Sequence, residues 1–238
     1  MFKLIKNNLV VCFLILILSF SILISFTGCV KTDTGRGNFN ERRQNNFSQS
    51  QLDYFYEIAL GAEYGELDNV IHKWTDDIGI KIKGRPTDRD LETINEVIAE
   101  LNYIIDSIKL DIVVRDPDIE IYFDSVDKFS SIELNYIEGN SGFFWTWLDD
   151  RGALYKARIL IATDGINQKE RSHLIREELT QSLGMMNDSY LYKDSIFYQD
   201  WTDTGSYTDI DRAVIRILYD PRIELEMTMD EIKDAIAK

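Results

Sequence analysis

Apolar residues recur every three or four positions in four stretches of the chain, which is the spacing of one face of a helix. Three of these stretches lie at residues 52–59, 167–184 and 208–219. The longest follows Thr87, an expected N-cap, and its apolar residues are Leu91, Ile94, Ile98, Leu101, Ile105 and Ile108. The pattern therefore predicts four helices.

Four other stretches are typical of strands, because they alternate apolar and polar residues or form short apolar runs. They lie at residues 78–83, 119–123, 143–148 and 154–162, and the turn-forming sequence Asp-Asp-Arg-Gly separates the last two. The order helix, strand, long helix, several strands, helix, loop and helix predicts an α+β domain. We expect its helices to pack on one mixed sheet.

The first thirty residues have a different pattern, which is typical of a secretory signal. Lys3 and Lys6 precede an uncharged and almost wholly apolar run from residue 9 to Phe26, and this run ends at Thr-Gly-Cys29. The ending resembles the lipobox of bacterial lipoproteins, although Phe26 stands where Leu or Val is usual. The resemblance implies that Cys29 is acylated, for example with palmitate, and becomes the mature N-terminus.

These features predict that the chain consists of three parts. Residues 1–28 form the lipoprotein signal peptide, residues 29–50 comprise the lipidated cysteine and a flexible polar linker, and residues 51–238 form one domain. We expect a lipid-anchored protein on the exported side of the cell membrane or envelope. The alternative is an uncleaved single-span anchor, since the apolar run approaches the ~18 residues of a span.

Charge and cysteine content limit the functions open to the domain. The full chain has a formal net charge of −15, and loss of Lys3 and Lys6 with the signal leaves 24 Lys and Arg against 41 Asp and Glu, a net charge of −17. We therefore expect no binding to nucleic acid and no docking on anionic lipid. Because Cys12 lies in the signal and Cys29 is acylated, no disulfide is expected within the domain.

The stretch at residues 173–189 carries the candidate chemistry, because its helix has two unlike faces. Glu177, Glu178 and Gln181 lie on one face, with Leu174 among them. The opposite face is apolar and consists of Ile175, Leu179, Leu183 and Met186. The alternative interpretation is a surface helix whose charged face is merely solvated.

Three segments in this half of the chain resemble zincin metallopeptidases. Residues 177–184 resemble the zinc helix His-Glu-x-x-His-x-x-Gly, with both histidines replaced. Residues 194–198 are similar to the turn that carries a Met beneath the metal in metzincins, with Phe197 at the Met position, and residues 207–219 resemble the closing helix of matrix-type enzymes. The run Arg-Glu-Glu…Gln…Leu-Gly…Asn-Asp-Ser resembles a bacterial lipoprotein family, domain of unknown function 2927. The resemblance implies a single zincin-like, or metzincin-like, domain.

The resemblance assigns positions rather than an activity. Glu178 stands at the position of the general base, and Glu177, Gln181 and Asn187 stand at the positions of the metal ligands. One carboxylate and two amides are poor ligands for zinc, so we expect no metal and no cofactor. His173 lies one turn before Glu177, where it forms either half of a displaced site or, as we expect, a partly exposed residue of the first turn.

The four tryptophans allow two interpretations. They lie either in a ligand cleft or in the core, and the shared strand face of Trp145 and Trp147 favours the core. The other two are Trp74 and Trp201.

The sequence therefore predicts an anchored lipoprotein with a degenerate zincin-like domain, in a non-catalytic role as a scaffold or as a binding domain for a protein or peptide. The first alternative is an atypical hydrolase centred on Glu178. The second is a structural envelope lipoprotein without a ligand cleft. Metal content and the presence of a cleft beside Glu178 distinguish the three.

Overall fold

The computed structural model describes residues 47–61 and 69–237. The predicted signal peptide, Cys29 and nearly all of the predicted linker lie outside the described residues. The strands are β1 (Ile78–Gly84), β2 (Leu110–Ile112), β3 (Ile119–Asp124), β4 (Gly142–Leu148) and β5 (Leu154–Ala162). The α-helices are α1 (Gln49–Ala59), α2 (Asp88–Ile104), α3 (Phe129–Ile132), α4 (Gln168–Gln181), α5 (Asp209–Leu218) and α6 (Met229–Ile236), and a 3-10 turn, η1 (Val126–Lys128), precedes α3.

The five strands form one mixed sheet in the order β2-β1-β3-β5-β4. The pairs β1–β2, β1–β3 and β3–β5 are parallel, whereas β4 pairs with β5 in the antiparallel sense at the edge of the sheet. The turn predicted between the last two strands makes this hairpin. The predicted α+β architecture, with helices packed on one mixed sheet, is confirmed.

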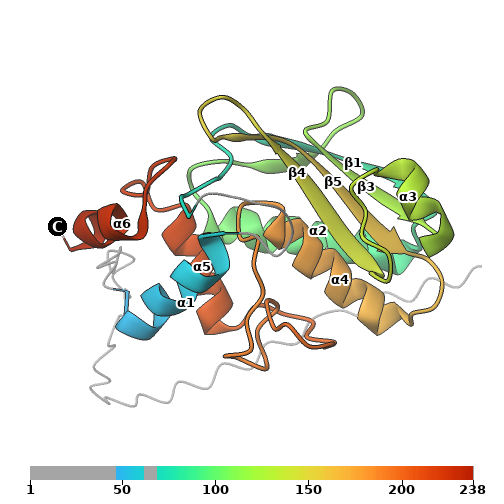
Figure 1. Cartoon of the computed structure of the whole chain (residues 1–238). Coiled ribbons are helices and arrows are strands. Elements are labelled where there is room, and N and C mark those ends of the chain that lie inside the picture. Colours follow the sequence, from blue (N-terminus) through green and yellow to red (C-terminus); the bar gives the residue numbers. More distant parts are fainter. Residues whose placement is uncertain (1–46, 62–68, 238) are drawn as a thin grey trace, which may run out of the picture. The chain divides into compact units, whose positions relative to one another are not determined.

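The helices α2 and α4 pack against each other, and α4 also contacts β4 and β5 (Figure 1). The main core lies between this helical layer and the sheet. A smaller cluster contains Phe129 of α3 together with Phe143, Leu160 and Ala162, and it uses alternate residues of β5. Since Ile159 and Ile161 belong to the main core, β5 is buried on both faces, which explains its continuous apolar run.

Helices α2 and α5 begin at the capping residues that the sequence indicated. The Thr87 hydroxyl accepts a hydrogen bond from the backbone N–H of Asp90 at 3.1 Å, and the Asp90 carboxylate accepts one from the N–H of Thr87 at 2.8 Å. Thr208 caps α5 in the same way. Local chemistry of the side chains therefore suffices to begin both helices.

The structure differs from the predictions in several details. Helix α2 ends at Ile104, although Ile105 and Ile108 are buried as the apolar stripe indicated. The pattern of apolar residues did not predict β2, because three residues are too few for alternation to show. It also missed α6, a short helix with one fully packed residue, Ile232. Within the described residues, no helix is both long and apolar enough to cross a membrane.

Candidate functional site

Helix α4 is fixed at both ends. At its beginning, the Asn167 side chain accepts hydrogen bonds from the N–H groups of Lys169 and Glu170, at 2.8 and 3.1 Å. Beyond its end, Gly184 has a φ of +114°, and a Cβ atom there would lie 2.2 Å from the backbone oxygen of His72. Only glycine allows this close approach and this backbone conformation. The predicted start of the helix is confirmed, whereas the helix ends at Gln181, three residues before the predicted end at Gly184.

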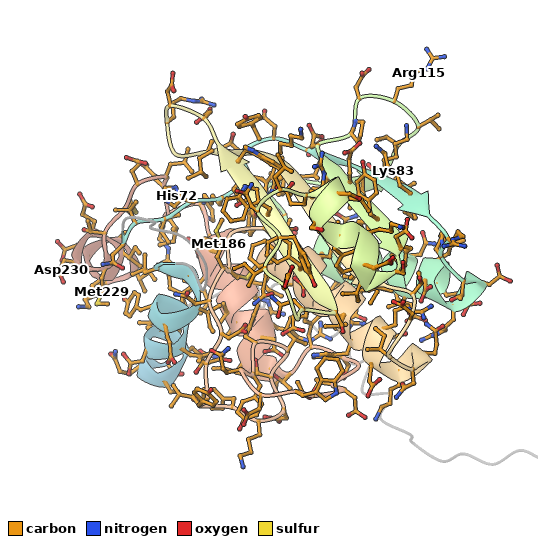
Figure 2. All side chains as sticks on the ribbon, turned by 45° about the vertical axis from the view of Figure 1, so that its right-hand side comes forward. His72, Lys83, Arg115, Met186, Met229 and Asp230 are labelled. Atoms are coloured by element: carbon orange, nitrogen blue, oxygen red, sulfur yellow. The ribbon has the colours of Figure 1, made fainter. Side chains whose placement is uncertain are left out.

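Both faces of α4 are buried. The apolar residues Ile175, Leu179, Leu183 and Met186 lie in the main core (Figure 2 shows Met186 among the packed side chains). The polar face is covered as well, since Glu178 is 7% exposed and Gln181 is 3% exposed. The interpretation of α4 as a solvated surface helix is therefore wrong, because segments distant in sequence cover its polar side.

A cleft of about 350 Å³ lies along this polar face. Helix α4 forms one side, the residues before and within the first part of β4 form another, and the long loop between α4 and α5 closes it. The lining residues are 139–144, His173, Leu174, Glu177, Glu178, Gln181, Asp188 and 198–202.

His173 is buried in the cleft wall, which corrects the prediction of a partly exposed residue. Its Nδ1 lies 2.8 Å from the carbonyl oxygen of Thr204, and its Nε2 lies 3.1 Å from a carboxylate oxygen of Glu177. Both neighbours can only accept hydrogen bonds, so the doubly protonated ring fits this position. Burial lowers the pKa of His173, but the hydrogen bond and the charge of Glu177 outweigh burial and raise it above its usual value.

Glu178 faces β4. A Cβ atom at Gly142 would lie 2.4 Å from Oε1 of Glu178 and 2.8 Å from a methyl carbon of Leu174. The glycine therefore allows the edge strand to lie directly against the carboxylate. This position, buried and inside the cleft, is the one that the sequence assigned to a general base.

The structure brings Gln181 together with Asp188 rather than with Asn187. The side-chain Nε2 of Gln181 donates a hydrogen bond to Oδ1 of Asp188 at 2.6 Å. Asn187 instead donates from its side chain to the carbonyl oxygens of Glu57 and Leu60, at 3.0 and 3.4 Å, and so fixes the end of α1. It does not line the cleft, because its side chain points away toward α1.

The loop that closes the cleft is held by a buried hydrogen-bonded chain. The Tyr54 hydroxyl of α1 donates to Oγ of Ser195 at 2.9 Å, and Ser195 donates to a carboxylate oxygen of Asp211 in α5 at 2.5 Å. Burial raises the pKa of the Asp211 carboxyl. These bonds fix the loop just before the residues at 198–202 that enter the cleft.

The same loop presents aromatic side chains around the cleft. Trp201 lines the cleft and is 59% exposed, whereas Phe197, at the position assigned to a Met, is fully buried. Tyr198 also lines the cleft and meets Tyr190 edge to face, with ring centroids 6.1 Å apart. Of the four tryptophans, Trp201 therefore belongs to the cleft. The sequence indicated a cleft position for Trp201 only as one of two interpretations, and it did not indicate Tyr198 or Asp188. Only the position of these residues in the loop after α4 could have pointed to them.

The residues at the assigned ligand positions do not fit a zinc ion. Glu177 is bound to His173, Gln181 to Asp188, and Asn187 lies outside the cleft. Within the part of the chain that the structure describes, no group of three or more His, Cys, Asp and Glu residues is arranged to hold a metal ion. Amides are poor zinc ligands in any arrangement.

Comparisons with known proteins give a family and a distant structural likeness. A family model described as "Protein of unknown function (DUF2927)" matches residues 48–238. Two solved structures of myroilysin resemble the chain with a TM-score of 0.42 each, at 12% and 11% identity, over 63% and 62% of this chain and 82% and 86% of theirs. At this TM-score the likeness says nothing about chemistry. No curated protein matches the sequence.

Proposed function

Because the chain belongs to the DUF2927 family of proteins of unknown function, whose description names no activity, we propose a function from its cleft. The domain is a degenerate zincin-like binding module that takes a ligand into the cleft along α4 and carries out no zinc-dependent hydrolysis. We propose that the ligand is itself a protein or a peptide.

The observation that carries this proposal is the engagement of the two side chains at the former histidine positions. Glu177 is bound to the buried His173 at 3.1 Å, and Gln181 is bound to Asp188 at 2.6 Å. A metal would have to break both contacts and would gain a carboxylate and an amide in return. Without a metal, no water is acidified toward neutral pH for Glu178 to deprotonate.

One observation favours an atypical hydrolase as the second candidate. Glu178 is 7% exposed and lies in the same cleft as the His173–Glu177 pair, so a carboxyl group and an imidazole ring line one cavity. Such a pair resembles the acid and base of a general acid–base mechanism. In that case hydrolysis would be independent of metal and would require Glu178.

We also propose that the domain is held by a lipid on Cys29 at the exported side of the cell membrane or envelope. The support is the basic, apolar and Gly-Cys sequence of residues 1–29. The strong negative charge of the chain agrees with an anchor that does not depend on attraction to anionic lipid.

Metal analysis and a hydrolysis assay test the proposed function together. The full-length chain, purified in detergent and dialysed against zinc and then against buffer, should retain no stoichiometric metal and should cleave no peptide library with or without a chelator. Glu178→Gln should leave the fold largely intact, since it keeps the size of the side chain. Stoichiometric metal that disappears in Glu177→Ala, with hydrolysis that disappears in Glu178→Gln, would overturn the proposal in favour of a hydrolase.

A further inference from the structure

We propose that the loop between α4 and α5 rests on a zwitterionic lipid surface, with Tyr190, Leu191 and Trp201 inserted among the lipid headgroups. This inference rests on the proposed lipid anchor at Cys29, and it specifies which side of the domain meets the membrane. It follows from the exposed apolar side chains of the loop, from the bonds that hold the loop in place and from the point at which the chain enters the domain.

Three large apolar side chains are exposed on this loop. Tyr190 is 65% exposed, Leu191 is 63% exposed and Trp201 is 59% exposed. Exposed apolar groups that gather on one segment mark surfaces that contact a protein or a membrane. Two of the three are aromatic residues with a polar group, and such residues concentrate at the boundary between lipid and water. The exposed side chains therefore fit a lipid surface.

The backbone of the loop holds these side chains outward. The N–H of Ser189 donates a hydrogen bond to the carbonyl oxygen of Phe197 at 2.8 Å, and the N–H of Gln199 donates one to the carbonyl oxygen of Ser189 at 3.0 Å. Phe197 is fully buried beneath them. The ring of Tyr190 meets that of Tyr198 edge to face, with centroids 6.1 Å apart. The exposed side chains cannot turn into the core unless these contacts break.

The loop lies beside the helix at which the chain enters the domain. Tyr54 of α1 meets Tyr192 of the loop edge to face, with ring centroids 4.8 Å apart. Figure 1 shows the beginning of α1 and the loop at the same side of the domain, the lower side in that view. A chain that approaches α1 from the membrane therefore brings the loop toward the membrane as well.

The length of chain before α1 limits how far the domain can lie from a lipid on Cys29. Seventeen residues, 30–46, separate Cys29 from Phe47, the first described residue. A flexible chain of that length has a root-mean-square span of about 20–25 Å. The anchor thus keeps the loop at a high local concentration near lipid, so that a contact by three side chains suffices although it would be weak in a free domain.

Charged residues of the loop indicate the kind of lipid. Residues 182–208 contain four Asp residues and one basic residue, Lys193. Asp194 and Asp200 are exposed beside the apolar side chains. At the depth of the headgroups these carboxylates stay in water, but the negative surface potential of anionic lipid would repel them. The contact therefore depends on apolar insertion into zwitterionic lipid and not on attraction between charges.

Quenching of tryptophan fluorescence by brominated lipid tests this inference. The acylated chain, purified from the membrane fraction, is reconstituted into phosphatidylcholine vesicles whose acyl chains carry bromine just below the headgroups. The quenched fraction of the emission should be at least about threefold larger for the wild-type chain than for Trp201→Phe, because Trp201 supplies the ring at the lipid boundary. Addition of anionic phosphatidylglycerol should reduce the quenching.

A matched pair of tyrosines separates the loop from other exposed aromatic positions. In the Trp201→Phe background, Tyr190→Trp should restore the quenching, whereas Tyr103→Trp should not. Tyr103 is 80% exposed near the end of α2. Its neighbour Asn102 donates a hydrogen bond to the carbonyl oxygen of Leu110 in β2, which lies at the edge of the sheet opposite β4.

The outcomes distinguish this inference from the proposed anchor. A chain that stays with the vesicles but shows no quenching, or shows equal quenching in the wild type and Trp201→Phe, would overturn the inference and leave the anchor standing. Equal quenching of Tyr190→Trp and Tyr103→Trp would overturn it as well, and so would quenching that requires anionic lipid. A chain that does not stay with the vesicles would overturn the anchor and the inference together.

Discussion

The buried His173 and the half-buried Lys73 have opposite electrostatic environments. The ring of His173 meets a carboxylate and a carbonyl oxygen, which together raise its pKa in spite of burial. Lys73 instead donates hydrogen bonds to the carbonyl oxygens of Leu218 and Ile223, at 3.0 and 2.5 Å. Burial lowers the pKa of Lys73 to about 8, and the charges of Asp220 and Glu224 offset this effect only in part. The two pKa values shift in opposite directions because a carboxylate lies next to the His173 ring, whereas the hydrogen-bond acceptors next to Lys73 are uncharged carbonyl oxygens.

The lowered pKa of Lys73 predicts a pH dependence of stability. Between pH 8 and 10.5 the unfolded chain keeps a proton that the folded chain has lost, so the free energy of unfolding rises with pH in this window. Relative to Lys73→Met, which has no such proton, the wild-type protein should gain up to about 3 kcal/mol across the window. Urea unfolding of both proteins from pH 7 to 10.5 measures the gain.

The comparison with Lys73→Met also removes the effect of other groups. Burial raises the pKa of Tyr54, and this side chain lowers stability near the upper end of the window in both proteins alike. Stability curves of the two proteins that run parallel from pH 7 to 10.5 would show that Lys73 is not desolvated in solution.

Helix α4 owes its position to contacts on every side. It packs against α2, β4 and β5. Two ion pairs join it to α2, a buried one in which Arg171 lies 3.3 Å from Asp90 and a partly buried one in which Arg176 lies 3.1 Å from Glu100. A helix enclosed in this way is a rigid support for the side chains that line the cleft.

Truncation of its apolar face should be costly. Leu179 is fully buried, so Leu179→Ala should reduce the free energy of unfolding by about 2–5 kcal/mol through lost contacts and a cavity. The matched control is Leu134→Ala, because Leu134 is 92% exposed and its truncation should cost less than about 0.5 kcal/mol. Chemical denaturation measures both. Equal costs for the two variants would contradict the burial of α4.

The whole chain divides into residues 1–44 and a compact unit, Asn45–Lys238, which has its own core and contains the cleft. The proposed lipid anchor belongs to the first part and the proposed ligand site to the second. The two proposals can therefore be tested by separate substitutions.

Anchoring should depend on one sulfur atom. Cells that express the wild-type chain should incorporate labelled palmitate into it, and the protein should sediment with membranes. Cys29→Ser removes the thiol that would be acylated, so both the label and the signal cleavage should be lost, whereas Cys12→Ser should leave them unchanged. Label that persists in Cys29→Ser would exclude a lipid at this position.

Much of the fold could be predicted from the local pattern. The spacing of apolar residues and the capping residues Thr87, Asn167 and Thr208 gave α2, α4 and α5 with nearly correct limits, because each depends on neighbours within a turn or two. Alternation and short apolar runs gave β1, β3, β4 and β5 for the same reason. The two unlike faces of α4 were equally visible.

The candidate site was less accessible to such reasoning. Whether the polar face of α4 is solvated or enclosed depends on residues 139–144 and 198–202, which reach it only through the path of the chain. The path of the chain buries His173 against Thr204 and places Asp188, rather than Asn187, beside Gln181. It also brings Trp201 to the cleft. The spacing of apolar residues shows which residues share one face of a helix. The burial of that face and its contact partners depend on segments that are distant in the sequence, and only the folded chain brings these segments together.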